Sequence, residues 1–140
     1  MKFDYPDITK SDVCVRAWGK DLEEAFVNMA LGSFNVVTPI EKIRPVKEER
    51  VDISSEDIKS LLYDWIEHLI VKFDGEMTVF SKFSIGISKS RGKYHLKGKM
   101  FGDKIRKTHE IHTHLKAVTY HLMKIEKTKK GYELQLILDI

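Results

Sequence analysis

The spacing of hydrophobic residues changes near the middle of this chain. In the first half, two segments carry apolar residues every three or four positions, which predicts two amphipathic helices. From Met77 onward the spacing is two, which predicts strands. Helices early and strands late favour an α+β domain, with two helices packed on one face of a mostly antiparallel sheet of about six strands. The predicted element order is β-α-β-α-β-β-β-β.

Local signals set the limits of the first helix. Asp21 is expected to cap it, with Glu24 three residues on as in a capping box. Gly32 within it costs about 1 kcal/mol relative to alanine. Thr38-Pro39 is expected to end the helix, because the residue before a proline disfavours helical geometry.

The second helix carries the clearest apolar stripe in the chain. Ser54 or Ser55 is expected to cap it, and Asp74-Gly75 to stop it. The stripe consists of Ile58, Leu61, Leu62, Trp65, Ile66, Leu69, Ile70 and Phe73.

Six segments have the alternation or apolar content of strands. They are residues 13–18, 46–53, 77–88, 94–101, 117–126 and 132–139. The segment 46–53 is so charged that we expect an edge strand. Turns are expected at Arg91-Gly92 and at residues 127–131, and the polar stretch 102–115 is expected to be a loop.

Composition narrows the class of protein. The 140 residues are 42% hydrophobic and 32% charged, with a net charge of +3, as in an ordinary soluble protein of one domain. We expect no membrane span and no signal peptide, so the predicted location is the cytoplasm. The single Cys14 excludes an intramolecular disulfide and a multi-cysteine zinc site.

Two carboxylates are expected side by side at the end of the last strand, the side chain of Asp139 and the terminal carboxylate of Ile140. Two negative charges at such a short separation repel each other unless a metal ion or a lysine neutralises them. Asp12 stands just before the first strand and would join them if the first and last strands are neighbours. Such oxygen ligands suit Ca²⁺, Mg²⁺ or Mn²⁺. The alternative is that Asp12 caps a turn and the terminus is solvated.

Lys116 lies where the polar loop enters the strand 117–126. A lysine there can pair with carboxylates or with phosphate as a compact point charge. The alternative is a surface lysine whose stem covers apolar neighbours.

The loop histidines allow a second metal hypothesis. His112 and His114 could chelate zinc from an extended segment, with Glu110 as a third ligand. The run from His109 is not His-Glu-x-x-His, because the second histidine arrives one residue early. A solvated loop explains the same residues.

Several stretches together resemble the archease family, in order and from one end of the chain to the other. They are Asp12-Val-Cys-Val-Arg-Ala-Trp-Gly19, Asp21-Leu-Glu-Glu-Ala-Phe26, Ser60-Leu-Leu-Tyr-Asp-Trp65, Phe80-Ser-Lys-Phe83, Lys116-Ala-Val-Thr-Tyr120 and Ile137-Leu-Asp-Ile140. The resemblance implies one archease-like domain over residues 1–140.

The resemblance also implies a function. Archeases are cytoplasmic cofactor proteins of the RtcB-type tRNA-splicing ligase, and they promote its GTP-dependent guanylylation and multiple turnover and relax its nucleotide choice. The implied role is that of a ligase activator, not an enzyme, with contact to nucleic acid only through the ligase and none with a membrane.

The family's residues can be carried over onto this chain. The resemblance implies a divalent cation, most readily Ca²⁺, on Asp12, Asp139 and Ile140, and an activating role for Lys116. Asp7, Asp64 and His114 are candidates for residues that surround the ligands and orient them without contacting the cation.

The chain departs from the family pattern at two places. It has Ile8-Thr-Lys-Ser-Asp12 where the family usually has His-Thr-Ala-Asp, so a supporting histidine is absent. It has His112-Thr-His114 where the family tends towards Gly-Thr-Glu.

Two other functions compete with the activator. One is a chaperone-like binding module that keeps RNA-modifying enzymes, such as a tRNA methyltransferase, soluble. The other is a small divalent-metal hydrolase built on the same acids.

Overall fold

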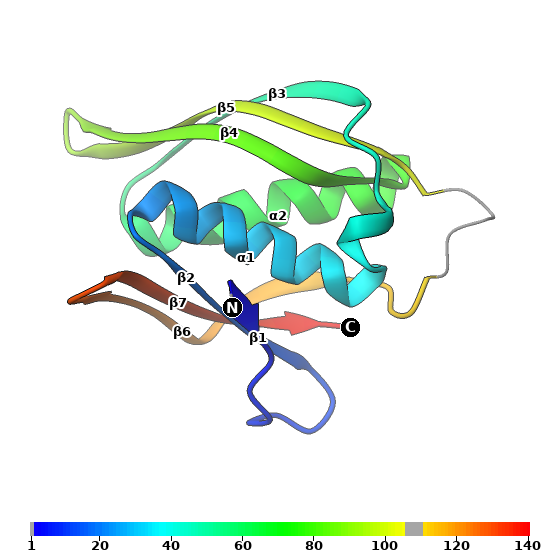
Figure 1. Cartoon of the computed structure of the whole chain (residues 1–140). Helices are drawn as coiled ribbons and strands as arrows, with labels where there is room; N and C mark the ends of the chain where they lie inside the picture. The colour runs from blue at the N-terminus through cyan, green and yellow to red at the C-terminus, as the bar shows by residue number, and fades with distance from the viewer. Residues whose placement is uncertain (1, 106–110) are drawn as a thin grey trace.

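Two antiparallel sheets lie on either side of a layer of helices, so the described part of the molecule has three layers (Figure 1). The computed structural model describes residues 2–105 and 111–140. One sheet has the order β1 (Phe3–Asp4), β2 (Val13–Gly19), β7 (Gly131–Asp139) and β6 (Ala117–Thr128). The other has the order β3 (Lys47–Ser55), β5 (Lys93–Lys104) and β4 (Thr78–Ser90).

The helical layer consists of α1 (Leu22–Val37) and α2 (Ile58–Glu76), with the short 3-10 helix η1 (Ile40–Lys42) after α1. The α+β class and the antiparallel pairing are confirmed. The described residues form seven strands rather than about six, because the short β1 was not predicted, and these strands divide between two sheets. The edge position of β3 is also confirmed.

The division into two sheets follows from the burial of α1. This helix packs on β2 of one sheet and on β4 of the other, and most of its residues from Ala25 to Val37 are buried. A helix that covered only one sheet would keep one polar face in water. The nearly continuous apolar run of α1 is therefore the sequence signal for a helix buried between two layers.

The helix limits agree with the sequence at α1 and differ at α2. Asp21 caps α1, and its side chain accepts a 2.8 Å hydrogen bond from the backbone N–H of Glu24, as predicted. The predicted cap of α2 at Ser54 or Ser55 is wrong, because both serines belong to β3 and Asp57 caps the helix in a capping box with Ser60.

The C-terminal end of α2 lies slightly beyond its predicted stop. The helix continues through Gly75 to Glu76 and ends at Met77, which has a φ of 51°. The left-handed residue that terminates the helix is therefore methionine rather than the glycine that the sequence suggested.

Gly32 allows the first sheet to approach α1 closely. A Cβ atom at Gly32 would lie 3.0 Å from side-chain atoms of both Phe3 and Val15. The hydroxyl of Tyr5 also donates a 2.7 Å hydrogen bond to the Gly32 carbonyl. The helix-propensity cost of this glycine is thus offset by packing against β1 and β2.

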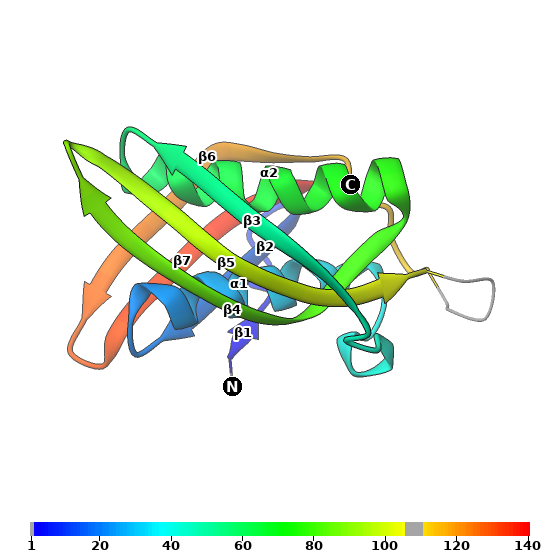
Figure 2. The same ribbon diagram turned by 90° about the horizontal axis from the view of Figure 1, so that it is seen from above.

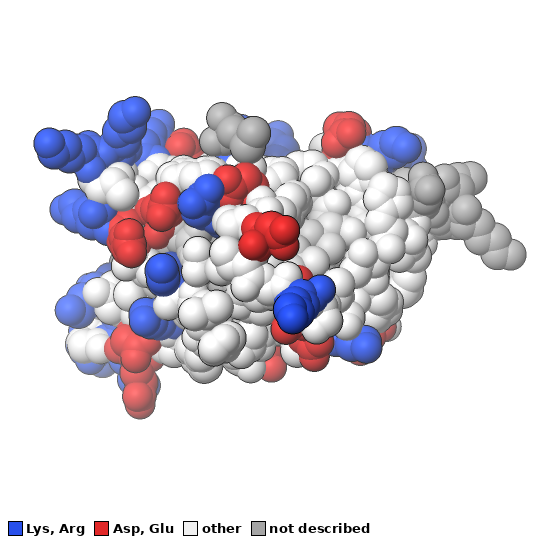
Figure 3. Space-filling model, turned by 90° about the horizontal axis from the view of Figure 1, so that it is seen from below, with Lys and Arg blue, Asp and Glu red and all other residues white. Residues whose placement is uncertain are grey.

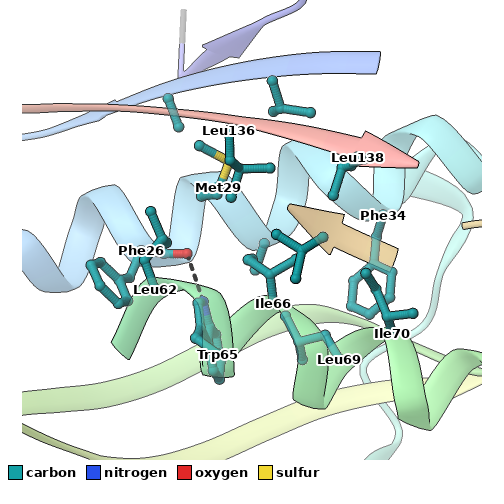
Figure 4. Close-up of a cluster of buried hydrophobic side chains, with 14 of the residues drawn as sticks. Phe26, Met29, Phe34, Leu62, Trp65, Ile66, Leu69, Ile70, Leu136 and Leu138 are labelled. Carbon is teal, nitrogen blue, oxygen red and sulfur yellow. Dashed lines mark hydrogen bonds between the residues drawn. The ribbon is translucent and has the colours of Figure 1, made fainter. Parts of the chain in front are cut away.

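The core lies between α1, α2 and β7 (Figure 4). Trp65 is fully buried, and its indole N–H donates a 3.0 Å hydrogen bond to the Phe26 carbonyl of α1. This bond gives the buried indole N–H a hydrogen-bond partner, which it would otherwise lack in the core. The labelled residues around it are Met29, Phe34, Leu62, Ile66, Leu69, Ile70, Leu136 and Leu138.

Strands β2 and β7, from opposite ends of the chain, are neighbours in the first sheet. Their register pairs Val13 with Leu138 and Gly19 with Tyr132. The condition under which Asp12 joins the carboxylates at the end of the last strand, that strands 13–18 and 132–139 are neighbours, is therefore met. Figures 1 and 2 place the C-terminus and the start of β6 at the same end of the molecule.

Candidate functional site

Three adjacent strands of the first sheet bring the predicted ligands and the predicted lysine to one sheet end. Val13 pairs with Leu138, so Asp12 stands at the mouth of β2 beside Asp139. Ala117 pairs with Asp139, and the backbone N–H of Lys116 donates a 2.9 Å hydrogen bond to the Asp139 carbonyl. We name Asp12, Lys116, Asp139 and Ile140 the tail cluster.

Alternation along β7 directs the side chains of the tail cluster. Leu138 is fully buried, whereas Asp139 is exposed and Ile140 is half-buried against the core. The packing of the Ile140 side chain orders the last residue of β7, so the carboxylate of Asp139 is presented to solvent from a fixed frame.

The acidic and basic side chains of the tail cluster are free to bind something else. Asp12, Asp139 and Lys116 are all exposed, and within the described parts of the chain their side chains have no hydrogen-bond or ion-pair partner. Charged groups without internal partners contribute little to folding. Their gathering at one sheet end therefore suits a ligand or a partner better than a structural role.

The segment between β1 and β2 shapes the surface beside Asp12. The Thr9 hydroxyl donates a 2.7 Å hydrogen bond to the Asp12 carbonyl, and the Ile8 N–H donates one of 3.0 Å to the Pro6 carbonyl. A shallow hollow is lined by Tyr5, Pro6, Asp7, Thr9, Asp12, Val13 and Cys14. Asp7 thus lies on the same hollow as Asp12, which suits a residue expected to surround the ligands.

Cys14, at this hollow, is buried, and burial raises the pKa of its thiol. A thiol whose pKa is raised stays protonated at neutral pH and is a poor nucleophile and a poor metal ligand. Cys14 is therefore a packing residue beside the site.

The other two candidates for residues that surround the ligands have partners elsewhere. The Ser55 hydroxyl donates a hydrogen bond to the carboxylate of Asp64. The His114 Nε2 lies 3.2 Å from Asp74 Oδ1, and its ring packs on Phe73 at a centroid distance of 4.7 Å. His114 lies two residues before Lys116, so it borders the tail cluster from the α2 side.

The zinc hypothesis involves residues that fall partly outside the described chain. His109 and Glu110 lie outside the described residues. The His112 N–H donates a 2.7 Å hydrogen bond to the Val37 carbonyl. Within residues 2–105 and 111–140, no group of three or more His, Cys, Asp or Glu side chains is placed to hold a metal ion.

The donor set of the tail cluster fits a hard cation in its chemistry. It offers the side-chain carboxylates of Asp12 and Asp139 at neighbouring strand ends, and the main chain of Ile140 beside them. Ca²⁺, Mg²⁺ and Mn²⁺ take oxygen ligands and complete their shells with water. Two side-chain carboxylates give a partial cage, which leaves positions for water or for oxygen atoms of a second molecule.

One feature beside the site was not predicted from the sequence. The expected regular strand 117–126 is broken by a bulge between Thr119 and Lys124. The signal was a change of phase in the apolar positions, because Val118 is buried on one phase and Met123 on the other.

The charge on the face of the first sheet is uneven. Seen from below, lysines and arginines crowd the left end of this face, and charged residues are sparser over its right-hand half (Figure 3). The turn between β6 and β7 contributes the exposed Lys129 and Lys130. This basic end is the opposite end of β7 from the tail cluster.

Within the described helices, none is long and apolar enough to cross a membrane.

Comparison with known proteins identifies the family. The sequence model of the Archease protein family (MTH1598/TM1083) matches residues 3–140. The chain is 40% identical over 138 residues to protein archease of Methanothermobacter thermautotrophicus, covering 99% of this chain and 98% of the relative. It is 41% identical over 141 residues to protein archease of Sulfurisphaera tokodaii, covering 100% and 99%.

Two solved structures share the fold. The solution structure of Methanobacterium thermoautotrophicum protein 1598 has a TM-score of 0.86 at 40% identity, covering 99% of this chain and 98% of that one. The crystal structure of an archease, described as a possible chaperone, from Thermotoga maritima has a TM-score of 0.58 at 16% identity, covering 96% and 95%. The chain belongs to the archease family.

Proposed function

We propose that this protein activates an RtcB-type tRNA-splicing RNA ligase by promoting its GTP-dependent guanylylation. The observation that carries the proposal is the tail cluster, in which the side chains of Asp12, Asp139 and Lys116 stand exposed at adjacent strand ends and have no partner among the described residues. Family membership supports it, because the resemblance that predicts this role places its functional residues on the same cluster.

In this proposal the chain is a protein cofactor rather than an enzyme, acting in the cytoplasm. The acidic end docks at the mouth of the ligase active site, and contact with nucleic acid passes through the ligase. Repeated guanylylation would support multiple turnover in tRNA splicing and broader nucleotide use. The ligase's own nucleophile attacks GTP.

Asp12, Asp139 and the terminal carboxylate of Ile140 would hold a divalent cation, with Ca²⁺ preferred and Mg²⁺ or Mn²⁺ as alternatives. A bound cation would supply positive charge for phosphate oxygens. The carboxylates would orient the docked end, because their strands fix them in the frame of the sheet.

Lys116 would neutralise phosphate charge as GTP binds the ligase. Its backbone is fixed by the hydrogen bond to Asp139, and its side chain is exposed. A flexible ammonium on a fixed backbone can reach a phosphate without rearrangement of the sheet.

The decisive experiment measures covalent GMP transfer to the purified ligase, with radiolabelled GTP, in the presence of wild-type protein or Asp139→Ala. Asp52→Ala is the matched control, because Asp52 is an exposed carboxylate on β3, in the other sheet. We expect stimulation by the wild type and by Asp52→Ala but not by Asp139→Ala. Full stimulation by a folded Asp139→Ala variant would overturn the proposal.

A second candidate is a chaperone-like module that keeps RNA-modifying enzymes, such as a tRNA methyltransferase, soluble. It is favoured by the description of the Thermotoga maritima archease as a possible chaperone. This function predicts that suppression of client aggregation is the same for wild type and Asp139→Ala, and that added Ca²⁺ does not alter it. Light scattering of a heated methyltransferase measures both.

A further inference from the structure

The bulge in β6 fixes an unusual backbone. Residues 120–123 of β6 stand opposite Leu136 alone, because Thr119 pairs with Ile137 and Lys124 with Gln135. Within the bulge, Leu122 has a φ of 59°, in the left-handed region that residues with a Cβ atom rarely adopt. Such strain persists only where neighbouring contacts enforce it, and it clusters at functional positions.

Specific contacts hold this backbone in place. The Gln135 Nε2 donates a 2.9 Å hydrogen bond to the Leu122 carbonyl, and the His121 N–H donates one of 3.1 Å to the Thr119 hydroxyl. Met123 is 5% exposed and anchors the bulge in the core. The bulge is therefore a built feature, and its effect is to turn the residues before Met123 outward.

The residues turned outward form an aromatic and aliphatic surface. Tyr120 is 51% exposed and Leu122 is 41% exposed. The ring of Tyr120 stacks on that of Tyr63 from α2, with centroids 4.4 Å apart and planes within 10°. We name Tyr63, Tyr120 and Leu122 the tyrosine patch. The ring face of Tyr120 that does not contact Tyr63 is available to a ligand. Binding there costs little side-chain entropy, because the stack already orders the Tyr120 side chain.

Three acidic residues of α2 and its cap lie near the patch. Burial is the main cause that raises the pKa of the Tyr120 hydroxyl, and the nearby carboxylates of Asp64, Asp57 and Glu67 raise it further. Asp64 is fixed by the hydrogen bond from Ser55, and Asp57 is fixed as the cap of α2. Carboxylates around an exposed ring repel phosphate and attract a cation.

The chemistry that fits this patch is a guanidinium group. Arginine stacks on aromatic faces and pairs with carboxylates at the same time, and it is less strongly hydrated than lysine. Arginine and tyrosine are also the residues enriched at the centres of protein interfaces. An RNA base could stack on Tyr120, but its phosphates would meet three carboxylates.

The patch is continuous with the tail cluster. Tyr120, on β6, follows Lys116, the residue just before that strand, by four positions, a span of about 13 Å at the usual strand rise. An interface of standard size, about 800 Å² on each partner, covers both features. A partner that engages the tail cluster therefore reaches the patch without a second binding event.

We propose that the tyrosine patch is a docking site for an arginine-bearing segment of the protein partner. The inference rests on the proposed function, in which that partner is the ligase. It adds an anchoring surface to the tail cluster, so that affinity for the partner and stimulation of guanylylation depend on different residues.

The test measures the affinity of the purified ligase for wild-type protein, Tyr120→Ala and Tyr120→Phe by calorimetry. We expect Tyr120→Ala to weaken binding about tenfold or more. Tyr120→Phe keeps the ring and is expected to bind within about twofold of the wild type. Tyr94→Ala is the control, because Tyr94 is a tyrosine of β5, in the other sheet, and the Lys89 ammonium already lies 5.3 Å from its ring centroid.

A second variant tests the acidic surroundings. Glu67→Gln removes one charge from an exposed residue of α2 and leaves the stack intact. We expect the variant to bind the ligase about twofold more weakly than the wild type. We also expect its affinity to fall about twofold less than that of the wild type when the salt concentration rises from 50 to 300 mM. Equal affinity at every salt concentration would contradict the charge complementarity on which the arginine assignment depends.

The outcomes separate the inference from the proposed function. If folded Tyr120→Ala binds the ligase as the wild type does, the tyrosine patch is not the dock, and the activation proposal stands. If the wild type neither binds the ligase nor stimulates guanylylation, both fail. If Tyr120→Ala retains ligase binding but loses retention of a single-stranded RNA oligonucleotide, the patch binds bases and the arginine assignment is overturned.

Discussion

Lys116 and Asp139 are joined by a 2.9 Å hydrogen bond from the backbone N–H of Lys116 to the carbonyl oxygen of Asp139. This bond involves only main-chain atoms, so it survives substitution of either side chain. The two charged side chains can therefore be tested separately, while the strands that carry them stay paired.

Substitution of Lys116 separates phosphate neutralisation from metal binding. We expect Lys116→Met to lower stimulation of ligase guanylylation by about tenfold at subsaturating GTP, with a raised KM for GTP. Calcium binding to the variant is expected to stay within about twofold of the wild type. Lys104→Met is the control, because Lys104 is an exposed lysine that ends β5. Equal kinetics for Lys116→Met and wild type would contradict the role of the lysine.

Calcium is expected to stabilise the wild-type protein. A ligand that binds only the folded state at about 100 times its Kd stabilises that state by about 2.7 kcal/mol. Thermal unfolding with 5 mM CaCl₂ or with EDTA measures this shift, and Asp139→Ala is expected to lose most of it. A wild-type unfolding midpoint that is the same with calcium and with EDTA would contradict the metal proposal. The docking role of the acids would then be tested by measuring ligase affinity.

An added residue tests the terminal carboxylate. One glycine after Ile140 moves the main-chain carboxylate away but leaves the side chains of Asp139 and Ile140 in place. We expect ligase stimulation and calcium affinity to fall together, with the unfolding midpoint in EDTA unchanged. If stimulation is retained in full, the terminal carboxylate is not a ligand.

Two glycines in helices are expected to respond oppositely to alanine. Gly75→Ala adds a Cβ atom that meets nothing within 4 Å, so it should stabilise the protein by about 0.4–1 kcal/mol. Gly32→Ala places its Cβ 3.0 Å from both Phe3 and Val15, so overpacking outweighs the gain in helix propensity and costs about 1 kcal/mol. Urea unfolding monitored by tryptophan fluorescence measures both variants. Stabilisation by Gly32→Ala would show that the Phe3 and Val15 side chains move aside at little cost in free energy.

His68 is expected to weaken the fold in mild acid. Burial lowers the pKa of this half-buried side chain below the usual 6.5, and the ammonium of Lys72 lowers it further. Because the folded pKa lies below the unfolded one, the unfolded state binds the proton first. Stability is therefore full above about pH 6.5 and falls as the pH drops through that value towards the folded pKa.

His68→Gln tests this dependence. The free energy of unfolding of the variant is expected to change less between pH 7 and pH 5 than that of the wild type. His121→Gln is the control, because His121 is exposed in the β6 bulge. Identical pH profiles for His68→Gln and wild type would place the acid sensitivity elsewhere.

The sequence predicted the neighbours of the tail cluster better than the layers of the fold. Asp12 and Asp139 could be named as partners from the sequence on one condition, that the strands carrying them are neighbours, and the register of β2 with β7 places Asp12 beside Asp139. Alternation reports which face of a strand is buried, but not which sheet the strand joins. The separate sheet of β3, β5 and β4 was therefore not predicted.

Two local features escaped prediction for different reasons. Ser54, Ser55 and Asp57 are all good helix caps, so spacing alone did not choose among them, and pairing of the serines in β3 decided for Asp57. The β6 bulge was hidden because Tyr120 and Leu122 continue the phase of Val118. Only the burial of Met123 on the other phase reveals it.

The pairing of β2 with β7 also has a consequence for folding kinetics. Contacts across these strands join distant parts of the chain, as in the 2.7 Å hydrogen bond from Trp18 Nε1 to Glu133 Oε1 across 115 positions. Pairing over such separations forms slowly, because the entropy of closing a long loop must be overcome first. Asp12 and Asp139 therefore meet only when the first sheet closes, and ion binding by a refolding chain should appear with the slowest phase rather than with collapse.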